Sequence, residues 1–371
     1  MSVFSVDEEV SELRDTVRSL LTRSSDTTRV RQVMAEAVPF DKPLWRRLSE
    51  ELGVAGLLVP EEYGGAGFSF AGCAAVLEEL GRSLACVPFL ASSVLAVSAL
   101  LEAGTDEARA AYLPGLADGS VIGTLALLEP GTSSWAPGDV ALALDEAGPT
   151  LTGVKRLVLD GGEAGLILAA VRTSTGLALV AVDTSDPSVT VTPDVVLDQT
   201  RGFATVGFDS TPVVVVSSGD VEAALARVIE LGSTALAVES IGGAQRCLEM
   251  SVEYAKTRYQ FGRPIGSYQA ISHKCADMLA DVELSRSTAA YVVWATDHAD
   301  FEERSIAAET AAAQCSDAYL RVAGDTIQIH GGIGFTWEHD AHLYFKRAKA
   351  AELLFGDAID HRRRLADLIK L

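Results

Sequence analysis

The chain of 371 residues is poor in cysteine and histidine, and neither residue type is grouped. The five cysteines lack paired spacing and lie scattered within apolar segments, at Cys73, Cys86, Cys247, Cys275 and Cys315. This excludes a disulfide framework and favours reduced core cysteines in a cytoplasmic protein. Of the six histidines, His339 and His342 are three residues apart but have no third ligand nearby. We therefore expect no metal site.

Long apolar runs and an excess of positive charge are missing as well. No uncharged apolar run reaches the roughly 18 residues of a membrane-spanning helix. Residues 1–14 are acidic and amphipathic, unlike a secretory signal. The formal net charge of -21 would repel nucleic-acid phosphates and anionic membranes. We thus expect neither nucleic acid nor a membrane as a partner, and read the basic runs at 346–349 and 362–364 as solvated or subunit-facing helix surface.

The residues that are present favour two or three domains, because 48% are apolar and the chain is long for one core. Apolar residues three and four apart predict an N-terminal helical domain, residues 1–120, with helices at 6–21, 43–52 and 71–84. Short apolar runs separated by Gly, Pro, Asp and Ser predict a small β domain over residues 121–217. Long helical patterns joined by short turns predict a four-helix bundle over residues 218–371.

Polar residues predict where the bundle helices begin. Ser217 with Asp220 resembles a capping box for a helix that reaches about residue 256. Asp300 with Glu303 predicts a second start, for a helix ending near residue 329. Between them, Ser267 is predicted to begin a helix of its own.

One segment between two predicted helices has the composition of an anion site. Residues 257–269 read TRYQFGRPIGSYQ, with an arginine and two glutamines around a Gly-containing turn. A guanidinium offers a planar fork of donors to phosphate oxygens, and a helix N-terminus adds a positive dipole end. On this segment alone, a solvated interhelical turn is an equally good interpretation.

A second segment, residues 328–335, reads QIHGGIGF and ends another long helix with backbone that a ligand can approach closely. Together the two segments, with the WEHD of residues 337–340, resemble the C-terminal domain of the acyl-CoA dehydrogenases. LLVPEEYGGAG at residues 57–67 resembles the N-terminal "VPEEYGG" stretch of that family. Three segments in the family's order extend the resemblance over nearly the whole chain.

The resemblance implies an α+β multidomain fold with an N-terminal α-helical domain, a middle small β-sheet or barrel domain and a C-terminal four-helix bundle. It also implies α,β-dehydrogenation of an acyl-CoA thioester. In that reaction a carboxylate removes the α-proton, FAD takes the β-hydride, and the electrons pass to an electron-transferring flavoprotein. In this family each flavin is shared by two subunits, one at its ring and the other at its diphosphate.

The residues that hold the diphosphate end in the family have counterparts here. The resemblance implies FAD contacts for Arg258, Gln260, Phe261, Gln269, Gln328, Gly331 and Gly332. For Phe261, a plain core position is an equally good interpretation. Arg258 and Gln328 are the strongest of the set.

The flavin-ring end departs from the family pattern. Leu128 stands where a threonine hydroxyl usually bonds the flavin, and Leu157 and Leu159 replace the stacking tryptophan and a second hydroxyl donor. Aliphatic side chains cannot donate hydrogen bonds, and each lost bond costs about 1–3 kcal/mol. We expect a poor ring pocket in this chain.

The family's catalytic base is missing too. Its usual C-terminal position falls on Phe355, and the alternative position on the first bundle helix falls on Gly232. Glu239 and Asp357 are the weak remaining candidates, with Asp357 better explained as a helix N-cap or an ion-pair partner.

Three functional hypotheses remain open. In the first, the chain resembles the base-lacking subunit of actinobacterial α2β2 acyl-CoA dehydrogenases acting on steroid side chains, and a homologous subunit supplies the base and ring pocket. In the second, it is a self-sufficient homotetramer with Glu239 or Asp357 as an unusual base. In the third, it is a non-catalytic scaffold of the same fold, which would have no use for a diphosphate half-site.

Overall fold

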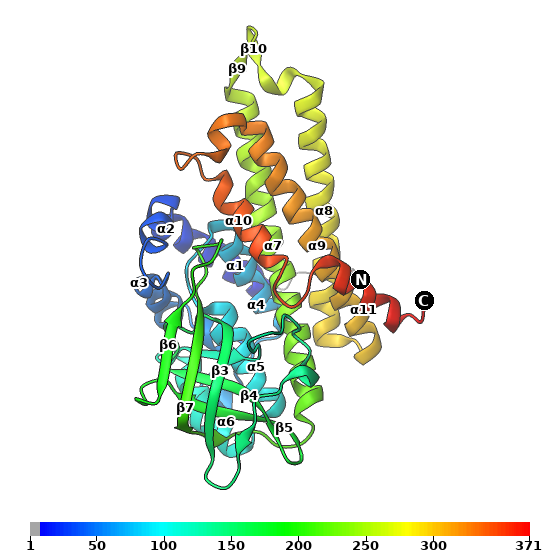
Figure 1. Cartoon of the computed structure of the whole chain (residues 1–371). Helices are drawn as coiled ribbons and strands as arrows, with labels where there is room; N and C mark the ends of the chain where they lie inside the picture. The colour runs from blue at the N-terminus through cyan, green and yellow to red at the C-terminus, as the bar shows by residue number, and fades with distance from the viewer. Residues whose placement is uncertain (1–7) are drawn as a thin grey trace. The chain divides into compact units, whose positions relative to one another are not determined.

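The computed structural model describes residues 8–371, which form two compact units. The bundle unit contains residues 8–28, 74–85 and 233–371, and the sandwich unit contains residues 29–73 and 86–232. Helices precede and follow a central β region in the sequence, as predicted (Figure 1). The first predicted helix begins at Glu8, and its expected start at residue 6 lies outside the described residues.

The sandwich unit contains two four-stranded sheets. The first has the order β1 (Gly123–Ala126), β4 (Leu166–Thr173), β5 (Gly176–Asp183), β8 (Val214–Val215), and the second the order β2 (Leu144–Asp145), β3 (Thr150–Leu159), β7 (Phe203–Pro212), β6 (Val189–Pro193). Neighbouring strands are antiparallel except β1 and β4. Every predicted apolar run from residue 121 to 216 contains or overlaps one of these strands.

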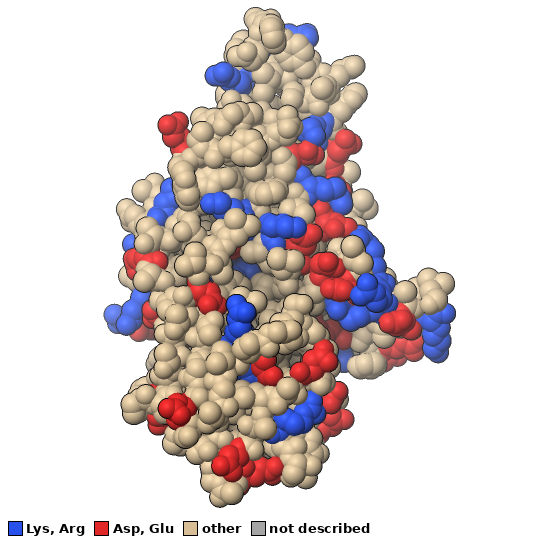
Figure 2. All heavy atoms as spheres, in the orientation of Figure 1, with Lys and Arg blue, Asp and Glu red and all other residues tan. Residues whose placement is uncertain are grey.

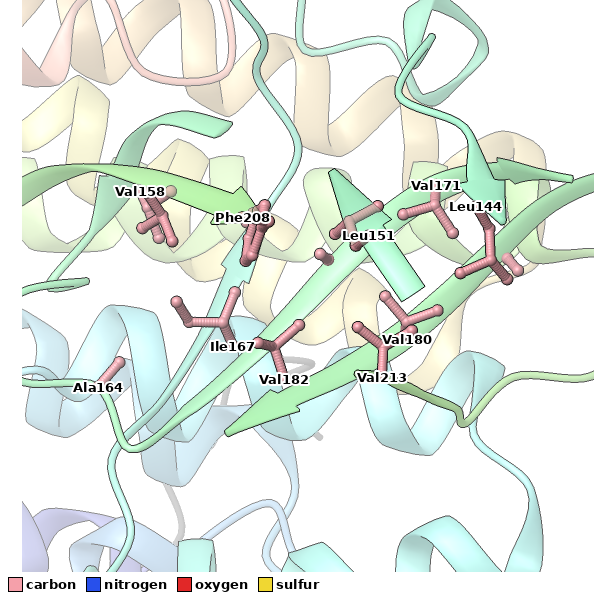
Figure 3. Close-up of a cluster of buried hydrophobic side chains, with 14 residues drawn as sticks. Leu144, Leu151, Val158, Ala164, Ile167, Val171, Val180, Val182, Phe208 and Val213 are labelled. Atoms are coloured by element: carbon pink, nitrogen blue, oxygen red, sulfur yellow. The ribbon is translucent and has the colours of Figure 1, made fainter. Parts of the chain in front are cut away.

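A shared apolar core lies between the two sheets. Alternate residues of β4 and β5 point into it, such as Ile167 and Val180, because side chains of a strand alternate between its faces. Leu151 of β3 and Phe208 of β7 meet them from the second sheet (Figure 3). The short apolar runs that predicted a β domain supply most of these core side chains.

Short helices complete the sandwich unit, and most of them lie in the predicted N-terminal helical domain. They are α3 (Lys42–Arg46), α5 (Val97–Ala103) and α6 (Asp106–Ala117), with π-helical turns at Arg47–Glu51 and Phe89–Ala96. Single 3₁₀ turns lie at Val54–Gly56, Glu61–Tyr63 and Pro137–Asp139, and α2 (Thr27–Val33) begins at the end of the first bundle-unit segment. Asp41 and Thr105 cap α3 and α6 by accepting backbone N–H groups.

The bundle unit is built around α9 (Phe301–His330), which packs against α8 (Gln269–His298), α10 (Ala341–Ala351) and α11 (Ala358–Leu368). The other helices of the unit are α1 (Glu8–Ser24) and most of α4 (Phe70–Ser83) and α7 (Val221–Thr257). The predicted four-helix bundle is therefore present as α7 to α10 (Figure 1).

Glycines let α7 approach its neighbours closely. A Cβ on Gly242 would lie 1.8 Å from the carbonyl oxygen of Glu78 in α4, and one on Gly243 would lie 2.4 Å from the Tyr319 ring in α9. No side chain fits at either distance, so these two positions fix α7 between α4 and α9.

Two of the predicted helix starts are corrected. Asp220, not Ser217, caps α7, because its carboxylate accepts the N–H of Ala223 at 3.1 Å. The Ser217 hydroxyl instead accepts the N–H of Leu179 in β5. Ser267 ends a 3₁₀ turn, Ile265–Ser267, and its hydroxyl donates to the Pro264 carbonyl just before that turn. The helix α8 therefore begins two residues later. Asp300 caps α9 as predicted, by accepting the N–H of Glu303.

All five cysteines are free, and four of them are buried. None of the helices within residues 8–371 is both long and apolar enough to cross a bilayer. Over the same residues, no three His, Cys, Asp or Glu side chains gather in a way that could hold a metal ion.

Candidate functional site

A two-stranded hairpin joins α7 to α8 at one end of the bundle (Figure 1). Its strands are β9 (Tyr259–Gln260) and β10 (Arg263–Pro264), and the turn residues Phe261 and Gly262 both have positive φ, +53° and +80°. The Tyr268 hydroxyl donates to the Gln260 carbonyl at 3.1 Å, and the Arg263 guanidinium stacks 4.0 Å above the Tyr268 ring. These contacts hold the hairpin in one shape.

Phe261 is not a core residue, so that interpretation was wrong. Its side chain is 93% exposed, and its positive φ costs an L-residue about 1–2 kcal/mol. An aromatic ring held in a strained turn and presented to solvent is a feature of contact surfaces. The hairpin thus presents Phe261 outward beside the predicted anion site.

Arg258 directly follows the last residue of α7 and precedes the hairpin. Its guanidinium is exposed and has no ion pair or hydrogen bond to any residue from 8 to 371. Gln260 and Gln269 are also exposed. The surrounding segment, residues 254–276, contains four Lys and Arg and no Asp or Glu, in a chain whose net charge is -21. Figure 2 shows only basic and uncharged side chains over this end of the bundle. Such a local field attracts an anion.

The end of α9 lies at the same end of the bundle. The ring centroids of Tyr254 in α7 and His330 in α9 are 4.4 Å apart. This contact joins the end of α7, next to Arg258, to the end of α9, which contains Gln328. Gln328 is exposed, and Gly331 has a φ of +62°. A Cβ on Gly331 or Gly332 would meet nothing within 4 Å, so this backbone is open to a ligand.

Arg258, Gln260 and Gln269 thus lie in or beside the hairpin. Gln328, Gly331 and Gly332 lie at the end of α9, which the contact between Tyr254 and His330 joins to α7. An unpaired guanidinium, glutamine amides and open glycine backbone form a set of donors suited to phosphate oxygens. The donor set fits the diphosphate half of FAD. Sequence reasoning missed Tyr254 and His330, although each lies within four residues of a predicted contact on the same helix.

The flavin-ring positions in the sandwich unit do not offer matching donors. Leu128 and Leu159 are each 3% exposed, so they belong to the interior of the unit, while Leu157 is 38% exposed with a φ of +49°. The strand pairing of β3 with β7 shifts between Lys155 and Val158, which places Leu157 in a bulge. No hydroxyl or aromatic ring is presented at these three positions, and they do not fit the ring end of FAD.

A buried ion pair holds this part of β3 in place. Lys155 is fully buried, and its Nζ donates to a Glu129 carboxylate oxygen at 2.6 Å and to the Leu127 carbonyl at 3.1 Å. Burial lowers the pKa of Lys155, opposed by Glu129. Burial alone would raise the pKa of Glu129, but bonds from Lys155 and two backbone N–H groups leave it lowered. The pair was not predicted, because its two members are 26 residues apart in sequence.

Sequence neighbours of the two base positions line one cavity of the bundle unit. A cavity with room for about one water, roughly 10 Å³, is lined by Ser233, next to Gly232, and by Leu354 and Gly356, on either side of Phe355. Phe355 is 2% exposed and has a φ of +64°. No carboxylate is among the residues that line this cavity. Both positions from which the family draws a base are thus next in sequence to residues that line this cavity, and neither carries a carboxylate.

The remaining carboxylate candidates are engaged elsewhere. Glu239 accepts a 2.6 Å hydrogen bond from the Arg347 guanidinium, and both side chains are more than nine-tenths buried. Asp357 caps α11 by accepting the N–H groups of Ile359 and Asp360, as its alternative role predicted. A base must be free to accept a proton, and neither group is.

Comparison with known proteins assigns the chain to a family. The model described as "Acyl-CoA dehydrogenase, N-terminal domain" matches residues 7–120, and "Acyl-CoA dehydrogenase, C-terminal domain" matches residues 222–369. The chain belongs to the acyl-CoA dehydrogenase family and has its fold, as the sequence predicted. It is an oxidoreductase of that family, and its cofactor is FAD.

Its relatives include actinobacterial acyl-CoA dehydrogenases and the solved structure of a steroid ACAD. Acyl-CoA dehydrogenase IpdE2 of Mycobacterium tuberculosis is 37% identical over 96% of both chains, and its namesake in Mycolicibacterium smegmatis is 36% identical over 97% of this chain and 98% of the relative. The ChsE4-ChsE5 complex from M. tuberculosis contains a chain with a TM-score of 0.89 and 31% identity, covering 99% of this chain and 98% of its own. A variant of the Tcur3481-Tcur3483 steroid ACAD gives a TM-score of 0.88 and 32% identity over 98% of both chains.

We expect the free energy of unfolding to depend on pH through His330, at the end of α9. Burial lowers the pKa of His330, the hydrogen bond to the Thr326 carbonyl opposes this, and nearby His339 lowers the pKa further. As the pH falls, His330 is protonated in the unfolded chain at a higher pH than in the folded one. The free energy of unfolding is therefore highest above the unfolded pKa of about 6.5 and decreases as the pH drops below it. Chemical denaturation at pH values of about 7.5 and 5.5 should show this loss of unfolding free energy.

The loss should be smaller in His330→Gln, because this buried imidazole is then absent from both the folded and the unfolded chain. The exposed His298 provides the control, because His298→Gln should leave the pH dependence of the wild type intact. Equal pH dependence in all three proteins would contradict the assignment to His330.

Proposed function

We propose that this chain is the subunit that supplies the diphosphate half-site for FAD to a homologous catalytic subunit, in an α2β2 acyl-CoA dehydrogenase. One observation carries the proposal. Arg258 has no side-chain ion pair or hydrogen bond within residues 8–371 and the backbone of Gly331 and Gly332 is open, whereas positions 128, 157 and 159 are leucines and positions 232 and 355 have no carboxylate. Random loss of function would erode all of these sites alike. The partner would supply the base and the ring pocket.

In this division of labour Arg258, Gln260 and Gln269 bind phosphate oxygens from the hairpin side, and Gln328 with the backbone of Gly332 binds them from α9. Phe261 packs against the shared cofactor or the partner. When bound, FAD accepts the hydride from Cβ of the acyl thioester, and the electrons pass on to an electron-transferring flavoprotein. The similarity to a steroid ACAD favours a steroid side chain as the acyl group.

Two other functions are less well supported. A self-sufficient homotetramer needs a base, and the engagement of Glu239 by Arg347 and of Asp357 at the start of α11 counts against both candidates. A scaffold without turnover has no use for an unpaired Arg258 beside open glycine backbone.

The visible absorbance spectrum of the chain, purified alone and with a family paralogue, tests the proposal. We expect a colourless protein alone and FAD only in the co-expressed complex, because one half-site lacks the bonds needed to retain the cofactor. Near-stoichiometric FAD in the chain alone would favour the homotetramer instead. A chain that neither binds FAD nor changes the activity of any paralogue would identify the scaffold.

A further inference from the structure

A second polar cavity lies in the bundle unit, away from the hairpin and from the base positions. Its volume is about 320 Å³, within the range of small-molecule sites. Four arginines line it: Arg14 and Arg18 from α1, Arg82 from α4 and Arg286 from α8. A chain with a formal net charge of -21 has thus gathered four guanidinium groups around one hollow.

Two of these cations share one carboxylate. Glu78 lies 2.8 Å from an Arg14 nitrogen and 2.6 Å from an Arg286 nitrogen, so one of the two positive charges is not compensated by it. Arg286 also donates to the side-chain oxygen of Gln245 at 3.2 Å.

The other two arginines have carboxylates of their own. Arg18 binds Glu79 through two nitrogens, and Arg82 binds Glu249 in the same bidentate way. Two charges that do not line the cavity cancel each other: Arg246 lies 3.5 Å from Glu249, and Asp15 lies near Arg18. Four lining cations therefore face three carboxylates.

Two of the three carboxylates lie deeper than the cations. The side chains of Glu78 and Glu79 are 10% and 1% exposed, whereas those of the four arginines are 27–48% exposed. Glu249, at 31%, is about as exposed as its partner Arg82, and it lines the cavity together with Glu78 and the four guanidinium groups. A guanidinium has five N–H donors, and each of these ion pairs uses only part of them.

We propose that this cavity binds the phosphate group of a small molecule. Planar donor forks from three helices around a net positive hollow match the several oxygens of a phosphate. A predominantly charged lining excludes an acyl chain as the ligand. The site is independent of the FAD half-site, since it shares no residue with it, and its ligand would tie α1 to α4 and α8.

Titration calorimetry on the full chain tests the proposal, with potassium phosphate added at constant ionic strength against potassium chloride. All proteins also carry Arg258→Ala, so that phosphate or nucleotide bound at the FAD half-site does not contribute. We expect saturable phosphate binding that Arg286→Gln weakens at least about tenfold. That substitution leaves Glu78 paired with Arg14, so no carboxylate is left bare.

The matched control is Arg321→Gln, which removes an equal charge from an ion pair with Asp281 between α8 and α9. It should bind phosphate like its parent. Arg14→Gln should reproduce the effect of Arg286→Gln, because the two share Glu78. The proposal is overturned if no saturable heat is seen, or if Arg286→Gln and Arg321→Gln behave alike.

Further titrations identify the source of the phosphate. If ADP binds more tightly than phosphate and its binding depends on Arg286, the ligand of the cavity is a nucleotide. If ADP binds no more tightly than phosphate, the ligand is free phosphate. Tighter binding of succinate than of either would overturn the assignment to phosphate.

Discussion

We expect that replacing Arg258 by alanine removes most of the FAD from the complex of this chain with the proposed catalytic subunit. The guanidinium is exposed, unpaired within residues 8–371 and surrounded by a segment without acidic residues. A hydrogen bond to a charged group contributes about 1.5–3 kcal/mol, and a bidentate contact to a diphosphate uses two. FAD affinity should therefore fall at least about tenfold, measured as bound flavin per complex after gel filtration and by fluorescence titration.

The folded state should keep its stability, because the Arg258 side chain forms no ion pair or hydrogen bond with residues 8–371. Lys256→Ala is the matched control, since Lys256 is an exposed cation on the same last turn of α7. It should keep both FAD and thermal stability. Unchanged FAD occupancy in Arg258→Ala would contradict the assignment of the diphosphate half-site to this chain. Equal losses of FAD in both variants would show that Arg258 acts only through its positive charge.

Glu239→Gln will lower the free energy of unfolding by about 3–5 kcal/mol. The substitution leaves the Arg347 guanidinium without its charged partner, although that side chain is only 4% exposed. Removing one member of a buried ion pair lowers the free energy of unfolding by more than the intact pair raises it, because the remaining charge stays out of contact with water. Urea denaturation of the full chain measures the change.

Two comparisons separate this structural role from a catalytic one. Glu253→Gln, on an exposed face of α7, should be nearly neutral. Removing both charges with Glu239→Gln and Arg347→Met should recover part of the lost stability. Activity from the isolated chain that Glu239→Gln abolishes at unchanged stability would instead make Glu239 the base of a homotetramer.

Local signals in the sequence predicted most of the fold. Short apolar runs at residues 166–171 and 177–182 predicted the strands β4 and β5, and Asp300 predicted the start of α9, because both depend on neighbours close in sequence. The Ser217 prediction failed for the opposite reason. Its hydroxyl is used by Leu179 of β5, a partner 38 residues away that no local pattern reveals.

The sequence by itself determined the family, the cofactor class and the missing base, since each depends on the identity of a residue at one position, such as Phe355 or Gly232. Only the tertiary structure decided how side chains are used. It placed Glu239 against Arg347, left Arg258 unpaired, and turned Phe261 outward at a positive φ. It also drew four arginines from three helices around one cavity. Burial and charge pairing depend on which helices meet, and that is fixed by packing over the whole unit rather than by any local run of residues.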